Sequence, residues 1–389
     1  MTASTSQPIH AGIITALVGF TSSFAVVIAG LHSVGASRSE AASGLLALCI
    51  TQGVGVIWLT RRYRMPLTLA WSTPGAAFLA GTGAITGGWA AAVGAFIVVG
   101  CAFVLTGLWP ALGRLITRIP TTIAQAMLAG VLLPLCLAPV TAVRDQPWAV
   151  IPVIAVWLLV LRFASRWAVP SAFVAAAIVI SYDLVRTGTS VPLSGLAPQI
   201  DLTTPHLTWQ AIVGIAIPLY IITMASQNIP GVAVMASFGY AVPWRSSMAV
   251  TGVGTIIGGP AGGHAINLAA ISAALAAGPD AHPDRDKRWV AASTAGWLYL
   301  VLGVASAAVV TLVAIAPPGV METVAGLALL GILASSLTSA LSEVVGREAA
   351  IAAFLVAASG VSIAGIGAAF WALVVGIVIR LVLVRRKSD

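Results

Sequence analysis

The sequence predicts an all-α polytopic membrane protein with about 14 transmembrane segments, arranged as two inverted repeats of seven. Composition is the first reason: 59% of the 389 residues are hydrophobic and 8% are charged, whereas soluble domains carry about 25% charged residues. The second reason is that two hydrophobic segments, about half a chain apart, are both interrupted by glycine and proline, around Pro74 and Pro260. Paired interruptions of this kind are typical of inverted-repeat transporters. The composition excludes a soluble globular protein.

The predicted spans follow from apolar runs, because a helix needs about 20 apolar residues to cross roughly 30 Å of hydrocarbon. We expect spans at about residues 11–31, 40–59, 66–83, 88–109, 120–140, 147–162, 168–185, 210–238, 247–259, 260–277, 289–316, 319–341, 348–366 and 368–384. Pro218, Pro230 and Pro260 divide the region between 210 and 277. One long helix could be counted there as two, so about 12 or 13 spans stay open.

Basic residues give the orientation, because Lys and Arg are enriched in short cytoplasmic loops. With the N-terminus in the cytoplasm, only Arg38, Arg144 and Arg186 of the 19 Lys and Arg residues fall outside. We therefore predict that both termini are cytoplasmic. The first repeat would cover residues 1–185, an external linker 186–209, and the second repeat 210–389.

Several classes of function are disfavoured by the sequence. The net charge is +8, but the basic residues lie in short loops and not in one patch, so we expect no nucleic-acid partner. The three cysteines lie inside apolar runs, where they read as small core residues, and no disulfide is predicted. Neither a nucleophile elbow nor a Walker loop nor a spaced Cys/His set is present. We predict no enzyme, no metal and no cofactor.

The third span carries the first predicted binding segment. Ser72 can cap a helix in which Pro74 takes the first position. A half-helix that starts in mid-membrane would direct its free N–H groups and the positive end of its dipole at a ligand. We therefore predict that Ser72, Thr73, Pro74 and Gly75 bind substrate.

The tenth span carries the second predicted binding segment. Gly263 and its neighbours interrupt the helix, and Asn267 is predicted to cap a new helix over 268–277. Two half-helix N-termini that face each other would suit a small organic carboxylate or another anion. Gly263 and Asn267 are therefore further predicted binding residues. The alternative is that glycine and proline merely allow close packing of helices.

Polar residues in two other spans extend the predicted site. The adjacent amides Gln227 and Asn228 of the eighth span could hydrogen-bond a substrate or only hold helices together. Phe20 and Ser22 lie midway along the first span, which is the counterpart of the eighth in the repeat. Phe20 and Trp71 could stack on an aromatic ring, although aromatic residues in spans are usually packing or interface anchors.

His264 is the only ionisable side chain expected near mid-membrane. Its unperturbed pKa, near 6.5, would allow it to carry a coupled proton. The alternative is a neutral, hydrogen-bonded histidine that only packs. We predict His264 as the proton-coupling residue and keep the packing alternative open.

Four motifs together resemble the benzoate transporter family (BenE), which is related to the nucleobase and ascorbate permeases. They are GFTSSF at 19–24, TLAWSTPG at 68–75, SQNIPG at 226–231 and GGPAGGHAIN at 258–267. The resemblance covers nearly the whole chain. Nucleobase relatives place a carboxylate in spans 8 and 10, where this chain has Gln227 and Asn267 or a neighbour, and this departure fits an anionic substrate.

The resemblance implies the UraA-like fold, in which spans 1–4 and 8–11 form a core and spans 5–7 and 12–14 form a gate that often dimerises. It also implies a protein of the bacterial inner membrane that imports benzoate, or a related small aromatic carboxylate, by proton symport. A nucleobase or inorganic-anion permease of the same fold is the alternative. A passive channel and a structural membrane subunit are further alternatives: a channel would show no gradient-driven accumulation, and a structural subunit would bind no small molecule.

Overall fold

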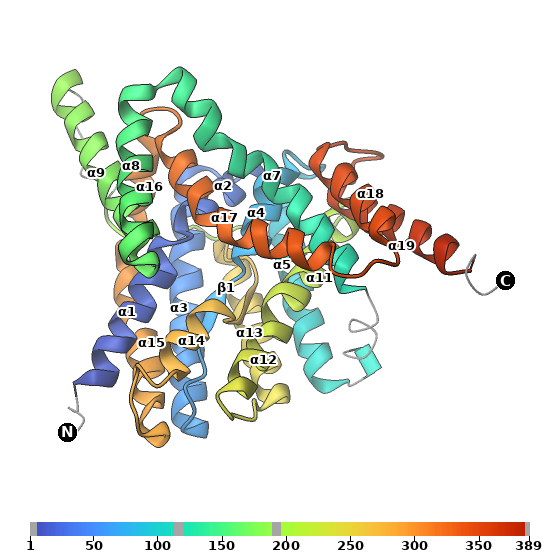
Figure 1. Ribbon diagram of the computed structural model, residues 1–389, viewed down its shortest axis with the longest axis horizontal. Helices are drawn as coiled ribbons and strands as arrows, with labels where there is room; N and C mark the ends of the chain where they lie inside the picture. The colour runs from blue at the N-terminus through green and yellow to red at the C-terminus, as the bar shows by residue number, and fades with distance from the viewer. Residues whose placement is uncertain (1–5, 110, 113–119, 189–195, 386–389) are drawn as a thin grey trace.

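The computed structural model describes residues 6–109, 111–112, 120–188 and 196–385, and these are helical nearly throughout (Figure 1). Part of the predicted linker, residues 189–195, lies outside the described residues. The first half contains α1 (Gln7–Thr21), α2 (Phe24–Ser33), α3 (Arg38–Tyr63), β1 (Leu69–Trp71), α4 (Thr73–Thr82), α5 (Gly88–Leu108), α7 (Thr121–Asp145), α8 (Pro147–Phe163), the 3₁₀ turn η1 (Ser165–Trp167) and α9 (Ala168–Thr187).

The second half begins with a long helix over Trp209–Ser237 that includes two π-helical turns. It contains α10 (Trp209–Ala211), the π-helical turn η3 (Ile212–Ala216), α11 (Ile217–Thr223), the π-helical turn η4 (Met224–Asn228), α12 (Ile229–Ser237), α13 (Trp244–Gly258), η5 (Gly259–Ala261), β2 (Ile266–Leu268), α14 (Ile271–Ala277), η6 (Arg285–Lys287), α15 (Trp289–Val304), α16 (Ser306–Ala314), α17 (Val320–Ala340), α18 (Arg347–Ala358) and α19 (Ala368–Arg385).

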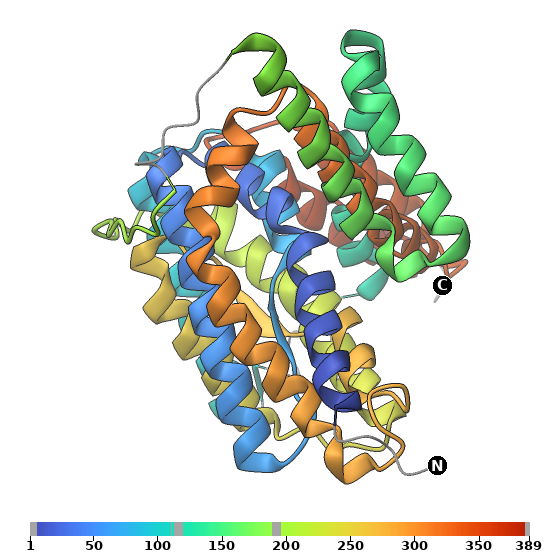
Figure 2. The ribbon, with the colours of Figure 1, turned by 90° about the vertical axis from the view of Figure 1, so that its left-hand side faces the viewer.

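The helices pack as two groups. In the α7 bundle, which is the upper part of Figure 1, α7 packs on α17 and α18, α8 on α9, and α18 on α19. In the α3 bundle, α3 packs on α15, α5 on α13, α1 on α15, and α2 on α4. Helices α3 and α15 run side by side in both ribbon views (Figure 2). If the predicted repeats are matched in chain order, α3 corresponds to α13 and α5 corresponds to α15. The contact between α3 and α15 then corresponds to the contact between α13 and α5, as two repeats would predict.

Helix length supports a multi-pass membrane protein. Among the described residues, seven helices are long and apolar enough to cross a membrane, or eight if α15 and α16, bent by 55°, are one span. Other predicted spans are shorter apolar helices, such as α8, or are divided between a strand and a helix. The 14-span arrangement stays a prediction.

The two interrupted segments meet at a short antiparallel sheet. Strand β1 pairs with β2, and Ala70 lies opposite Asn267. Helix α4 follows β1, and α14 follows β2 after two residues. Thr73 is the first residue of α4, so Pro74 takes the second position and not the predicted first.

The predicted helix cap at Asn267 is wrong. Asn267 lies in β2, and α14 begins at Ile271 with Ala270 at its N-cap position and no side-chain capping bond. The reason is that β2 has a strand partner, because pairing with β1 holds residues 266–268 in an extended conformation.

Candidate functional site

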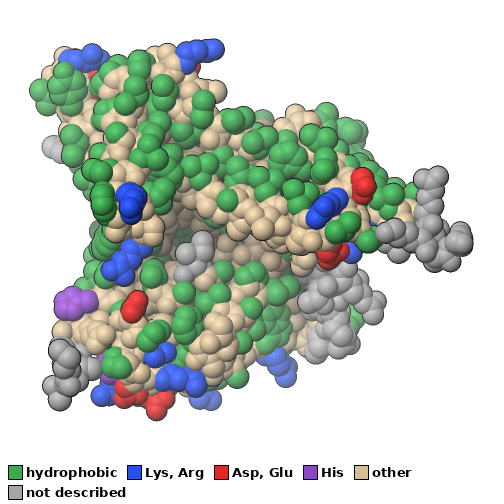
Figure 3. Space-filling model, viewed as in Figure 1, with side chains coloured by type: hydrophobic (Ala, Val, Ile, Leu, Met, Phe, Trp, Pro, Cys, Tyr) green, Lys and Arg blue, Asp and Glu red, His purple; other side chains and the backbone are tan. Residues whose placement is uncertain are grey.

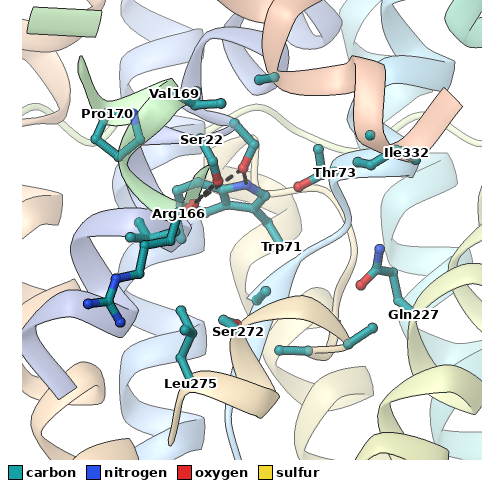
Figure 4. Close-up of a pocket in the computed structure, with 18 of the residues that line it drawn as sticks. Ser22, Trp71, Thr73, Arg166, Val169, Pro170, Gln227, Ser272, Leu275 and Ile332 are labelled. Carbon is teal, nitrogen blue, oxygen red and sulfur yellow. Dashed lines mark hydrogen bonds between the residues drawn. The ribbon is translucent and has the colours of Figure 1, made fainter. Parts of the chain in front are cut away.

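A cavity of about 290 Å³ lies between the α3 bundle and the α7 bundle. Figure 3 shows the surface hollowed between the upper and lower parts of the molecule. The described lining residues are Val18, Gly19, Ser22, Ser23, Gln52, Ala70, Trp71, Thr73, Ser165, Arg166, Val169, Pro170, Gln227, Ala269, Ala270, Ser272, Leu275, Tyr299, Ala328, Gly331, Ile332 and Ser335. Of the predicted binding residues, Ser22, Thr73 and Gln227 lie in this lining, together with Trp71 (Figure 4).

The start of α4 is fixed by Ser72. The Ser72 hydroxyl accepts a hydrogen bond from the Gly75 N–H at 3.0 Å and pairs with the Thr223 hydroxyl at 2.8 Å. Ser72, Pro74 and Gly75 are buried outside the lining, whereas Thr73 contributes to it. The Gly75 N–H is therefore bonded to the Ser72 cap, although it was one of the backbone donors expected to be free for a ligand. Thr73 and the positive end of the ten-residue helix α4 remain beside the cavity.

Close packing accounts for Gly75. A Cβ at this position would lie 2.4 Å from the Cδ1 atom of Leu219, which is shorter than any real contact. Gly75 therefore lets α4 approach α11, and this matches the packing alternative that the sequence left open.

Trp71 forms an aromatic wall of the cavity. Its indole Nε1 donates a hydrogen bond of 2.8 Å to the Ser23 hydroxyl, which lies at the break between α1 and α2. Phe20 packs behind it, with ring centroids 5.7 Å apart, and is buried outside the lining. In Figure 4 Ser22 and Arg166 lie on one side of the Trp71 ring, and Thr73 and Gln227 on the other.

The two adjacent amides of η4 differ in their surroundings. Gln227 lines the cavity, and its side chain has no hydrogen bond to any described residue. Asn228 is fully buried outside the lining, where its Oδ1 accepts a hydrogen bond of 2.9 Å from the backbone N–H of Leu268. Asn228 thus ties η4 to β2, which was the alternative reading of this residue.

The predicted residues of the tenth span lie outside the cavity lining. A Cβ at Gly263 would lie 3.0 Å from the Gly258 carbonyl oxygen, so close backbone packing accounts for this glycine. Asn267 donates a hydrogen bond of 2.8 Å to the Leu268 carbonyl. His264 is fully buried beside Phe96, with ring centroids 6.3 Å apart and no described partner for either nitrogen. His264 therefore packs beside an aromatic ring without the hydrogen bond that the packing alternative expects, and its proton-coupling role stays a prediction. Small residues of the same segment, such as Ala270 and Ser272, line the cavity in their place.

Three lining residues were missed by sequence reasoning. Arg166, in η1, was used only as a loop charge that marks topology. Gln52 in α3 and Tyr299 in α15 lie in apolar spans and belong to none of the four motifs. The signal for Gln52 was available, because an amide inside an apolar span needs a partner there.

The electrostatics of the cavity are simple. Arg166 is the one charged side chain among the described lining residues, and it forms no ion pair with any described residue. No Asp or Glu lies in the described lining. A cavity with a single cation and a mostly apolar wall suits a small ligand with one negative charge.

A ligand-sized cavity between two bundles of apolar helices defines the class of the protein, which is a multi-pass membrane transporter. Residues 2–382 match the family described as "Benzoate membrane transport protein" (BenE). The chain belongs to this family, and the resemblance seen in the four motifs is confirmed. The family is a transporter family and not an enzyme family.

Two relatives align over nearly the whole chain. The inner membrane protein YdcO of Escherichia coli (strain K12) is 37% identical over 373 residues, which are 96% of this chain and 95% of YdcO. The benzoate membrane transport protein of Acinetobacter baylyi is 29% identical over 379 residues, with 97% of this chain and 95% of that protein covered.

Two solved structures share the fold. The transmembrane domain of the cyanobacterial bicarbonate transporter BicA superposes with a TM-score of 0.60 at 16% identity, over 97% of this chain and 96% of that one. The structure of SLC26A9 has a TM-score of 0.63 at 13% identity, over 98% of this chain and 66% of that one. At these identities the similarity establishes the UraA-like fold alone.

Proposed function

We propose that this protein imports benzoate, or a closely related small aromatic carboxylate, by proton symport. One observation carries the proposal: the cavity combines the Trp71 wall with a single cation, Arg166, and no carboxylate among its described residues. Benzoate has the matching parts, an aromatic ring and one negative charge. The family and the name of the Acinetobacter relative agree with this substrate.

The carboxylate would bind between α4 and η4, where Thr73 and Gln227 offer a hydroxyl and an amide. The positive end of α4 favours an anion at this place. Arg166 lies across the Trp71 ring on the α7 bundle and would attract the anion as it enters. The ring would pack on Trp71.

The α3 bundle would act as the core and the α7 bundle as the gate of an alternating-access transporter. The cavity supports this division because both bundles contribute to its wall. The exchange of helix pairs between the two halves supports the inverted repeat. We further propose an inner-membrane location, both termini in the cytoplasm, and a homodimer formed through the gate.

Proton coupling and substrate are tested together in proteoliposomes with labelled benzoate and an inward proton gradient. We expect accumulation that a protonophore abolishes. Accumulation that persists with the protonophore would contradict proton coupling, and no uptake in either condition would contradict the substrate.

The role of Arg166 is tested by Arg166→Gln, with Arg162→Gln as the matched control, because Arg162 lies four residues earlier, in the last turn of α8, and outside the lining. Because the Arg166 side chain is exposed, its charge should contribute only about 0.2–1 kcal/mol to the binding free energy of benzoate. Benzoate affinity should fall by roughly 1.4- to fivefold in Arg166→Gln and stay unchanged in Arg162→Gln. Equal affinities in the two variants would remove Arg166 from the site.

A small inorganic anion is the second candidate, since Arg166 would also attract it and the structural neighbour BicA is named as a bicarbonate transporter. The apolar lining and Trp71 favour the aromatic ligand. Thermal shifts of the purified protein with benzoate, sulfate, bicarbonate and uracil separate these candidates, because a ligand that binds the folded state raises its melting temperature. A shift with sulfate or bicarbonate alone would replace benzoate by an inorganic anion.

A further inference from the structure

The cavity has a second polar region, formed by Gln52 of α3 and Tyr299 of α15. The Gln52 side chain is fully buried, and neither its Nε2 nor its Oε1 has a hydrogen-bond partner. The Tyr299 hydroxyl likewise makes no hydrogen bond to any residue that the structure describes, and both side chains line the cavity. A buried amide without a partner is costly, and most costly where no bulk water reaches it.

Close helix packing brings these two side chains to one place. Gly53 of α3 lies against the backbone of Gly296 of α15, and Cys49 lies against Gly303. Gln52 and Tyr299 are on the same stretch of this α3–α15 contact. Gly19 of α1 completes the enclosure, since a Cβ there would meet the Tyr299 hydroxyl. The unpartnered Gln52 amide and the Tyr299 hydroxyl thus both border the cavity at the contact between α3 and α15.

This polar region also borders the aromatic wall. The Tyr299 ring packs edge-on against Trp71, with centroids 6.3 Å apart. A ring that stacks at Trp71 would thus bring its edge toward Tyr299 and Gln52. Trp71 cannot donate a hydrogen bond to the Gln52 amide, because its only side-chain N–H is donated to the Ser23 hydroxyl.

We propose that Gln52 and Tyr299 form a hydroxyl-binding subsite, which makes ring-hydroxylated benzoates better ligands than benzoate. The amide can accept the hydroxyl proton and donate to the hydroxyl oxygen, and the Tyr299 hydroxyl can do the same. A site that holds a ligand hydroxyl discriminates against the analogue that lacks it, because its own polar groups are then left unpaired. This inference rests on the proposed function, since it names the substrates of the same cavity.

The test is the affinity of the purified full-length protein for benzoate and for 2-, 3- and 4-hydroxybenzoate, measured by calorimetry. In the wild type, at least one hydroxybenzoate should bind about three- to tenfold more tightly than benzoate, as one hydrogen bond would give. In Gln52→Leu and in Tyr299→Phe, the ratio of hydroxybenzoate to benzoate affinity should fall toward one. Ile50→Ala is the control, because Ile50 lies on α3 with an exposed side chain outside the lining, and it should keep the wild-type ratio.

The outcomes separate this inference from the proposed function. Benzoate binding with no preference for any hydroxybenzoate would overturn the subsite and leave the proposed function intact. A preference that survives in both Gln52→Leu and Tyr299→Phe would place the hydroxyl elsewhere and also overturn it. If none of the four acids binds, the proposed function fails together with the subsite.

Discussion

The two interrupted segments, β1–α4 and β2–α14, both consist of a short strand followed by a short helix, but the two helices start differently. After β1, the ten-residue helix α4 starts at a side-chain cap made by Ser72. After β2, the seven-residue helix α14 starts at Ala270 with no side-chain cap. The β1–α4 segment presents Trp71 and Thr73 to the cavity, whereas the β2–α14 segment presents mainly small residues.

The polar residues around β2 support its backbone and do not face the cavity. Side chains of two other elements hydrogen-bond the backbone of β2. The Ile266 N–H donates to the Thr255 hydroxyl at 3.1 Å, and the Leu268 N–H donates to Asn228 Oδ1 at 2.9 Å. Its polar neighbours are thus used for support. We infer that β1–α4 recognises the ligand and that β2–α14 leaves room for it.

The largest effect should come from Trp71→Ala, because it removes the aromatic wall and a buried side chain. Loss of a buried tryptophan typically costs about 3–5 kcal/mol, and benzoate binding should fall by more than about tenfold. Trp71→Phe is the control, since it keeps a smaller aromatic ring and loses the hydrogen bond to Ser23. Equal benzoate affinity in Trp71→Ala and the wild type would show that β1–α4 does not recognise the ring.

The adjacent amides of η4 give a sharper test, because one faces the cavity and the other supports β2. Asn228→Ala leaves the Leu268 N–H without its acceptor and should lower stability by about 1–3 kcal/mol, seen as a lower melting temperature. Gln227→Ala should leave the melting temperature nearly unchanged and weaken benzoate binding. The reverse pattern would exchange the roles of the two residues.

Ser72→Ala tests the cap that distinguishes the two helices. Loss of an N-cap costs about 0.5–2 kcal/mol, so the melting temperature should fall. Ser272→Ala is the matched change on α14, where serine caps nothing, and it should alter stability by less than about 0.5 kcal/mol. A larger loss in Ser272→Ala than in Ser72→Ala would refute the asymmetry.

The smallest effect on transport should come from His264→Gln. His264 lies in the β2–α14 region but away from the cavity lining. We expect the ratio of benzoate uptake with and without a proton gradient to stay at its wild-type value. Loss of gradient dependence at unchanged benzoate affinity would restore His264 as the proton carrier.

Several features could be predicted from the sequence because they depend on local or summed properties. The apolar composition requires a membrane environment, and loop charges and apolar runs predict where helices lie. The cap at Ser72 was predictable because a serine and the N–H three residues later meet within one helical turn. The four motifs sufficed for the family.

Other features were decided only by tertiary contacts. Asn267 forms part of a strand because it pairs with Ala70. Ala70 lies almost 200 residues earlier in the chain, so the pairing is not visible in the local sequence. Gln227 and Asn228 have the same chemistry, and only their different directions on η4 assign one to the cavity and the other to β2. Arg166, Gln52 and Tyr299 meet the cavity from three separate elements. Sequence spacing carries no information about such a meeting, because packing between distant segments determines which side chains share a space.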